Sequence, residues 1–108
     1  MSYKIISIPK FEKELKRLAK KYPSLKSEYK ELVQSLKQNP EQGTSLGNNC
    51  FKIRLAIVSK QKGRSGGARV VTYLQILESA VYLLTIFDKS EKETIPDKEL
   101  QALINLIP

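Results

Sequence analysis

Apolar residues recur with helical spacing in two neighbouring segments near the start of the chain. Pro9 suits the first turn of the first helix, which should end before Pro23 because the residue preceding a proline avoids helical backbone. Ser24 is a candidate N-cap for the second helix, and Asn39-Pro40 should end it. The apolar positions are Phe11, Leu15, Leu18, Ala19 and Tyr22 in the first helix and Leu25, Tyr29, Leu32, Val33 and Leu36 in the second.

Strand patterns follow in the second half of the chain. Residues 50–58 alternate between apolar and polar, 68–76 are β-branched and aromatic, and the continuous apolar run 80–87 indicates a central strand covered on both faces. Residues 3–7 predict a short edge strand, and the polar segment 41–49 predicts a loop. A last helix should be capped by Thr94 or Asp97, with Leu100, Leu103, Ile104 and Ile107 on its apolar face.

The predicted order is β-α-α-β-β-β-α, in one domain spanning residues 1–108. Short connections favour an antiparallel meander of the last three strands. The helical hairpin must bury its apolar stripe on one sheet face, which gives a two-layer α+β domain, mainly antiparallel, with a further helix at the C-terminus. The other sheet face would carry Lys52 and Arg54.

Charge is distributed unevenly along these elements. The 108 residues carry a net charge of +8, with no histidine and one cysteine. Positions 42–77 contain no acid, and their cations are Lys52, Arg54, Lys60, Lys62, Arg64 and Arg69. Such a stretch faces a polyanion, bulk counterions or an acidic protein.

Cys50 cannot form an internal disulfide and is expected to be a small buried apolar residue. With no secretory signal and no membrane-length apolar run, we expect a cytoplasmic protein.

Four of the polar side chains should converge if strands 50–58 and 68–76 pair. Side chains alternate along a strand, so Lys52 and Arg54 share a face of the first strand, and Arg69 and Tyr73 likewise share a face of the second. Together they offer cations for phosphates and a ring for stacking a base, as single-stranded RNA requires. The glycine-rich loop 60–67 would close its own cations over the RNA. Alternatively, the cations simply solvate an open sheet face, and Tyr73 and Tyr82 pack in the core.

The missing histidine limits the chemistry. Catalytic triads that use histidine and cysteine-histidine zinc sites are excluded, and the glycine loop lacks the Gly-Lys-Ser/Thr of a phosphate-binding P-loop. A ribonuclease of this composition would use the ribose 2′-hydroxyl as the attacking group and cations to stabilise the phosphorane. A lysine could serve as base only if neighbouring cations or burial depress its pKa. Glu91 and Glu93 fall in a hydrophilic turn and are expected to be solvated.

Three runs carry a resemblance to a known family: FKIRL at 51–55, KGRSGGARVV at 62–71 and VYLLTIFDKSEK at 81–92. They resemble the RelE/HigB branch of the RelE/ParE toxin superfamily. This implies a cytoplasmic toxin of a bacterial type II toxin–antitoxin pair that enters the ribosomal A site, against 16S rRNA. There it would cut mRNA through 2′-hydroxyl attack, with no metal or other cofactor. A cognate antitoxin would silence it, and operator DNA would be bound only through the antitoxin complex.

The resemblance also implies roles for individual residues. The basic residues of the family's second strand correspond to Lys52 and Arg54, and that of the third strand corresponds to Arg69. The basic residue after the fourth strand falls on Lys89 or Lys92. We therefore expect catalytic roles for Lys52, Arg54, Arg64, Arg69 and Lys89, and RNA-binding roles for Lys60, Lys62, Tyr73, Tyr82 and Lys92. Some members stack a base on a C-terminal aromatic, but no aromatic follows Phe87 here, so Tyr73 or Tyr82 would substitute.

Two other functions are compatible with the same fold. One is a non-enzymatic gyrase inhibitor like the ParE branch, in which the basic face docks protein or DNA. The other is an inactive relative that binds only antitoxin and operator DNA. Fold alone does not decide among the three.

Overall fold

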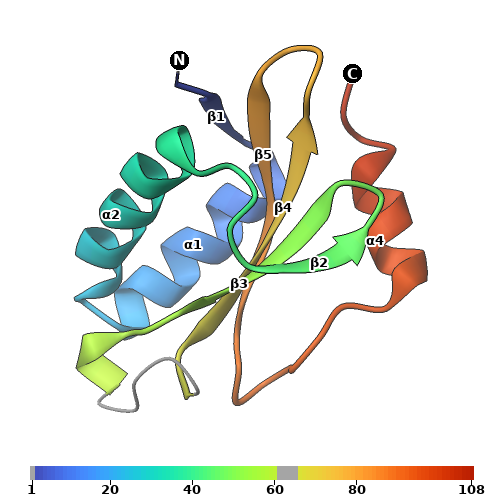
Figure 1. The fold of residues 1–108 in the computed structure, drawn as a ribbon. Helices are drawn as coiled ribbons and strands as arrows, with labels where there is room; N and C mark the ends of the chain where they lie inside the picture. Colours follow the sequence, from blue (N-terminus) through green and yellow to red (C-terminus); the bar gives the residue numbers. More distant parts are fainter. Residues whose placement is uncertain (1, 61–65) are drawn as a thin grey trace.

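A five-stranded sheet forms the centre of the molecule, with α1 and α2 on one side and α4 on the other (Figure 1). The structure is a computed structural model that describes residues 2–60 and 66–108. In chain order the elements are β1 (Lys4–Ser7), α1 (Pro9–Lys21), α2 (Leu25–Gln38), β2 (Thr44–Gly47), β3 (Cys50–Leu55), a 3₁₀ turn (Val58–Lys60), β4 (Ala68–Gln75), β5 (Ala80–Asp88) and α4 (Asp97–Ile104).

The two N-terminal helices begin and end at the boundaries predicted from the positions of the prolines. Pro9 is the first residue of α1, and α2 has Ser24 at its N-cap position. The Ser24 hydroxyl makes no capping bond; it contacts the Glu28 carboxylate and the Ser59 hydroxyl instead. For α4 the predicted caps were wrong, because Pro96 is the N-cap residue and its fixed φ suits a helix entry. None of the helices described is long and apolar enough to cross a membrane.

The strand order is β1-β5-β4-β3-β2. β3, β4 and β5 form the predicted antiparallel meander, while β1 adds to the edge of β5 in parallel. All nine residues of β5 are buried, which confirms the prediction of a covered interior strand. Beyond the end of β1, Glu14 of α1 accepts the Ile86 N–H at 3.3 Å and the Thr85 hydroxyl at 2.7 Å. The helix therefore provides an acceptor for one backbone N–H of β5 beyond the end of β1.

A fifth strand, β2, occupies part of the segment 41–49 that was predicted to be a loop. It pairs with β3 across a tight turn in which Asn48 and Asn49 both have positive φ (52° and 61°). Asparagine tolerates this left-handed backbone, and two such residues in a row are typical of hairpin turns whose twist matches the strands. The turn, rather than an apolar pattern, therefore determines β2.

Both sheet faces contribute to the core. Phe11, Leu18, Leu25 and Leu36 of the helical hairpin are fully buried, and Leu100 and Leu103 of α4 are nearly so. Cys50 is also fully buried, as predicted, and burial raises the pKa of its thiol to about 11. Because α4 covers part of the second face, that face is less open than the two-layer prediction implied. The loop entering α4 also crosses it.

Candidate functional site

The β3–β4 ladder brings three of the predicted site residues together. Arg54 and Arg69 are directly opposed across the two strands, and Lys52 is two residues from Arg54 on β3. The three side chains line one hollow of about 240 Å³, which we call the basic pocket. Glu93 and Thr94, from the loop between β5 and α4, complete its described lining. The predicted convergence of Lys52, Arg54 and Arg69 is confirmed.

Arg69 is the most enclosed residue of the basic pocket. Only 4% of it is exposed, and its Nη1 donates to the Ala68 carbonyl at 3.1 Å. Burial, and then the like charge of Arg54, lower the pKa of Arg69, while Glu93 partly offsets both effects. Like charges directly opposed across a ladder are destabilising. An Arg–Arg pair at this register therefore has a cost in stability, and a bound anion such as a phosphodiester would relieve it.

Glu93 and Thr94 were not predicted as site residues. The acidic turn was expected to be solvated, and the Glu93 side chain is indeed 76% exposed. It nevertheless lies at the rim of the basic pocket, with Oε1 3.4 Å from Lys89 Nζ. No local pattern in the sequence indicates this placement, because it depends on how the loop crosses the sheet. The backbone N–H of Lys89 donates to the Gly67 carbonyl at 3.0 Å, which holds Lys89 beside the start of β4.

Lys60 does not join the basic pocket. Its ammonium pairs with the Asp88 carboxylate, with only 7% and 0% of the two side chains exposed. Tyr22 donates its hydroxyl to Asp88 at 2.7 Å, and the Lys60 ammonium lies 5.2 Å from the Tyr22 ring centroid. This buried cluster fastens the end of α1, the segment after β3 and the loop after β5 to one another. The cluster holds the start of the loop that carries Lys89 and Glu93. Lys60 therefore has a structural role here, whereas the sequence predicted that it would lie in a mobile basic loop over the RNA.

The rest of the glycine-rich loop is described only at its end. Lys62, Gly63 and Arg64 lie outside the described residues. Gly67 was expected to keep the backbone mobile, but a Cβ at this position would lie 2.0 Å from the Leu55 carbonyl oxygen. Glycine is therefore required there for close approach of the two backbones.

The other predicted RNA contacts that the structure describes, Lys92, Tyr73 and Tyr82, are not among the described residues that line the basic pocket. Lys92 pairs with Glu99 at 2.9 Å and lies 5.2 Å from the Phe87 ring centroid, so it links α4 to β5. Tyr73 is four residues along β4 from Arg69, which is about 13 Å at the usual rise of a strand. Tyr82, its neighbour on β5, is 6% exposed and donates its hydroxyl to Glu78. Neither ring is among the described residues that line the basic pocket, although Tyr73 lies diagonally across the β3–β4 ladder from Lys52.

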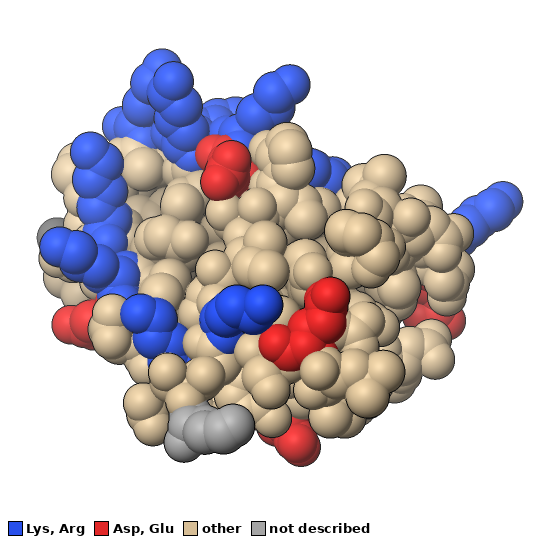
Figure 2. All heavy atoms as spheres, turned by 90° about the horizontal axis from the view of Figure 1, so that it is seen from above, with Lys and Arg blue, Asp and Glu red and all other residues tan. Residues whose placement is uncertain are grey.

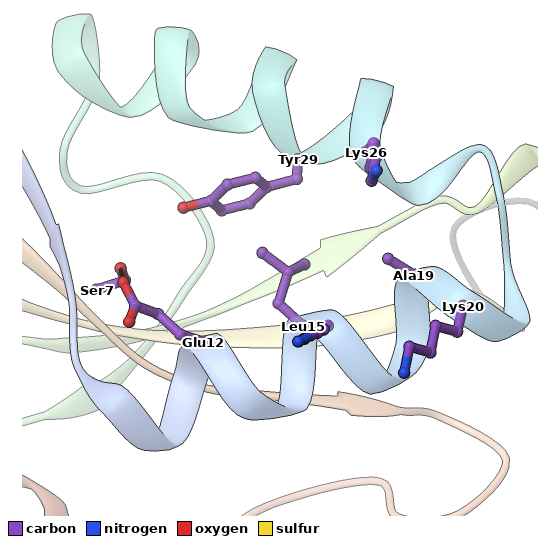
Figure 3. A pocket seen from close by; sticks show the side chains of 8 residues that line it. Ser7, Glu12, Leu15, Ala19, Lys20, Lys26 and Tyr29 are labelled. Carbon is purple, nitrogen blue, oxygen red and sulfur yellow. Dashed lines mark hydrogen bonds between the residues drawn. The ribbon is translucent and has the colours of Figure 1, made fainter.

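Neither the overall distribution of basic residues nor the size of a hollow singles out the basic pocket. In the view of Figure 2, Lys and Arg side chains stand along the upper and left edges of the molecule, and others lie further in on the face, so they are not confined to one cluster. A larger hollow of about 610 Å³ lies between α1 and α2, where Leu15, Ala19 and Tyr29 face one another and Lys20 and Lys26 stand at the rim (Figure 3). Its mostly apolar walls lack the opposed arginines of the basic pocket.

Comparison with known proteins decides the family. A family model described as the RelE toxin of the RelE/RelB toxin–antitoxin system matches residues 10–106. The chain belongs to the RelE toxin family. The toxin-family resemblance inferred from the sequence is thus confirmed.

Solved structures of RelE share the fold. A mutant of E. coli toxin RelE in the free state superposes with a TM-score of 0.67 at 17% identity, with all of both chains covered. The isolated E. coli RelE toxin gives 0.60 at 18% identity, over 98% of this chain and 100% of that one. The intact E. coli RelBE toxin–antitoxin complex gives 0.52 at 21% identity, over 81% and 96% of the two chains.

Proposed function

We propose that this RelE-family chain is a cytoplasmic endoribonuclease that cuts mRNA in the ribosomal A site and so inhibits translation. The observation that carries the proposal is the opposed Arg54–Arg69 pair, which lines one pocket with Lys52. Three cations around a hollow of about 240 Å³ suit the phosphate of a single-stranded RNA. The fold itself is shared with toxins of more than one activity, so the proposal depends on these residues.

The reaction we propose is attack of a ribose 2′-hydroxyl on the adjacent phosphorus, without a metal. Charge develops on the non-bridging oxygens of the phosphorane, where preorganised cations stabilise the transition state most. Arg69 is suited to this task because its burial and its bond to Ala68 fix the guanidinium before RNA arrives. Lys52 and Arg54 are more exposed than Arg69 and would bind the incoming phosphate. Lys89, whose ammonium lies 3.4 Å from the pocket residue Glu93, would protonate the departing 5′ oxygen.

An antitoxin partner is part of the proposal. E. coli RelE has been solved with the antitoxin RelB and with a RelB peptide. For this chain we propose a cognate antitoxin with an acidic segment that covers the basic pocket, because opposite charge would neutralise it and speed association. Contact with operator DNA would come through that complex.

Expression in a bacterial host tests the function. We expect translation to stop and cuts to appear within translated messages, mapped by primer extension, while untranslated RNA stays intact. Arg54→Gln should relieve the arrest, and Arg17→Gln, an equal charge change on an exposed residue of α1, should not. Growth arrest with intact messages and altered DNA supercoiling would contradict the proposal in favour of gyrase inhibition. If the protein binds antitoxin but its expression leaves growth unaffected, the proposed ribonuclease activity is contradicted, and the protein is an inactive relative.

A further inference from the structure

The basic pocket contains a carboxylate. Glu93 lines it together with Lys52, Arg54 and Arg69, and its negative charge acts directly on the Arg69 guanidinium. Glu91, two residues earlier in the same loop, instead lies 3.4 Å from Arg17 of α1. The loop therefore directs one glutamate into the pocket and the other away from it.

Stability alone does not account for Glu93. Its side chain is 76% exposed, and its contact with Lys89 is a single i,i+4 pair at 3.4 Å. Pairs that are this exposed contribute little to folding. An exposed carboxylate at the rim of a cationic pocket is, however, free to reach a bound ribose.

Resting on the proposed function, we propose that Glu93 is the general base that removes the proton from the attacking 2′-hydroxyl. The chain has no histidine, the usual residue for this step. A glutamate carries no proton at neutral pH, whereas a lysine must first lose one before it can act as base. Among the described residues that line the basic pocket, Glu93 is the one acid.

Glu93 and Lys89 together take up and supply the protons that the reaction moves. The Glu93 carboxylate takes the proton from O2′ as the O2′–P bond forms, and the P–O5′ bond breaks. The departing 5′ oxygen takes a proton from the Lys89 ammonium, which leaves a 2′,3′-cyclic phosphate and a 5′-hydroxyl. The proton on Glu93 then passes to the neutral Lys89 amine across their 3.4 Å contact, and both groups return to their starting charge.

Single-turnover cleavage of a defined mRNA on programmed bacterial ribosomes tests the assignment. Glu93→Gln keeps the size of the side chain and should slow cleavage by about 10²- to 10⁴-fold, the usual contribution of a general base. Toxin–ribosome affinity should be unchanged or higher, since an anion leaves a phosphate-binding pocket. Glu91→Gln removes the same charge from the same loop and should cleave at the wild-type rate.

The dependence of the rate on pH separates a base from a residue that only positions the cations. For the wild type, the logarithm of the rate should rise with pH at acidic values, and Glu93→Gln should lose this rise. If Glu93→Gln cleaves as fast as the wild type, or slowly with an unchanged pH profile, Glu93 is not the base. A wild type that cuts no mRNA would overturn the proposed function itself.

Discussion

Replacing Lys60 with methionine removes one half of the ion pair with Asp88. The two side chains are 7% and 0% exposed, and methionine leaves the carboxylate buried without its cation. Asp88 keeps the Tyr22 hydroxyl at 2.7 Å and the Ser90 N–H and hydroxyl at 2.9 and 2.8 Å. Removing one partner of a buried pair costs about 3–5 kcal/mol. We expect Lys60→Met to lower the free energy of unfolding by this amount at pH 7, a large share of the stability of a small domain.

The dependence on pH provides an independent check. Burial would raise the pKa of Asp88, but hydrogen bonds from Lys60, Tyr22 and Ser90 outweigh burial and hold that pKa well below its usual range. An aspartate in the unfolded chain has a pKa near 3.9, so the stabilisation is complete above about pH 5 and is lost as the pH falls toward the lower folded pKa. In Lys60→Met the largest lowering contact is gone, so the variant should lose less stability between pH 5 and pH 3 than the wild type.

Urea unfolding followed by circular dichroism measures both effects. Arg17→Met is the control, because the Arg17–Glu91 pair is exposed (58% and 49%) and should change stability by less than about 1 kcal/mol. A Lys60→Met protein as stable as the wild type would refute the structural role of Lys60. If that stable variant also failed to cleave RNA, Lys60 would belong with the RNA-binding residues, as the sequence had suggested.

Three further outcomes follow from the structure. Gly67→Ala should lower the free energy of unfolding by about 1–3 kcal/mol or more, because the new Cβ would lie 2.0 Å from the Leu55 carbonyl oxygen; unchanged urea unfolding would contradict this packing. Cys50 should resist thiol-reactive reagents at pH 8 until the protein is unfolded, because it is buried and its pKa is raised to about 11; rapid labelling of the native protein would show that the site opens. Antitoxin affinity, measured by calorimetry, should weaken as salt is raised; salt-independent binding would indicate an apolar interface away from the basic pocket.

The sequence was sufficient to predict most of the fold and the centre of the candidate site. Proline positions and apolar spacing located α1 and α2, and the period-two alternation placed Lys52 and Arg54 on one strand face. Short connections then fixed β3 and β4 as neighbours, which brought Arg69 opposite Arg54. These predictions succeeded because each depends on local geometry that repeats along the chain.

The parts that could not be predicted depend on contacts between distant segments. β2 has no apolar alternation, and it forms because Asn48 and Asn49 accept a left-handed turn. The buried Asp88 cluster joins three segments and removes Lys60 from the basic surface. The path of the loop before α4 brings Glu93 to the basic pocket. Neither Lys60 nor Glu93 differs in local pattern from a solvated charge.

Cleavage of a defined mRNA on purified, programmed ribosomes tests the central claim most directly. The wild-type chain should cut the message in the A-site codon, with ends mapped by primer extension. Lys52→Gln combined with Arg54→Gln should slow this cleavage at least 10²-fold at saturating toxin, since loss of one transition-state donor alone costs about 10²- to 10³-fold. Arg17→Gln should cut at the wild-type rate. An uncut message with the wild type, or equal rates for the wild type and the double variant, would contradict an RNA-cleaving site built on the opposed strands β3 and β4.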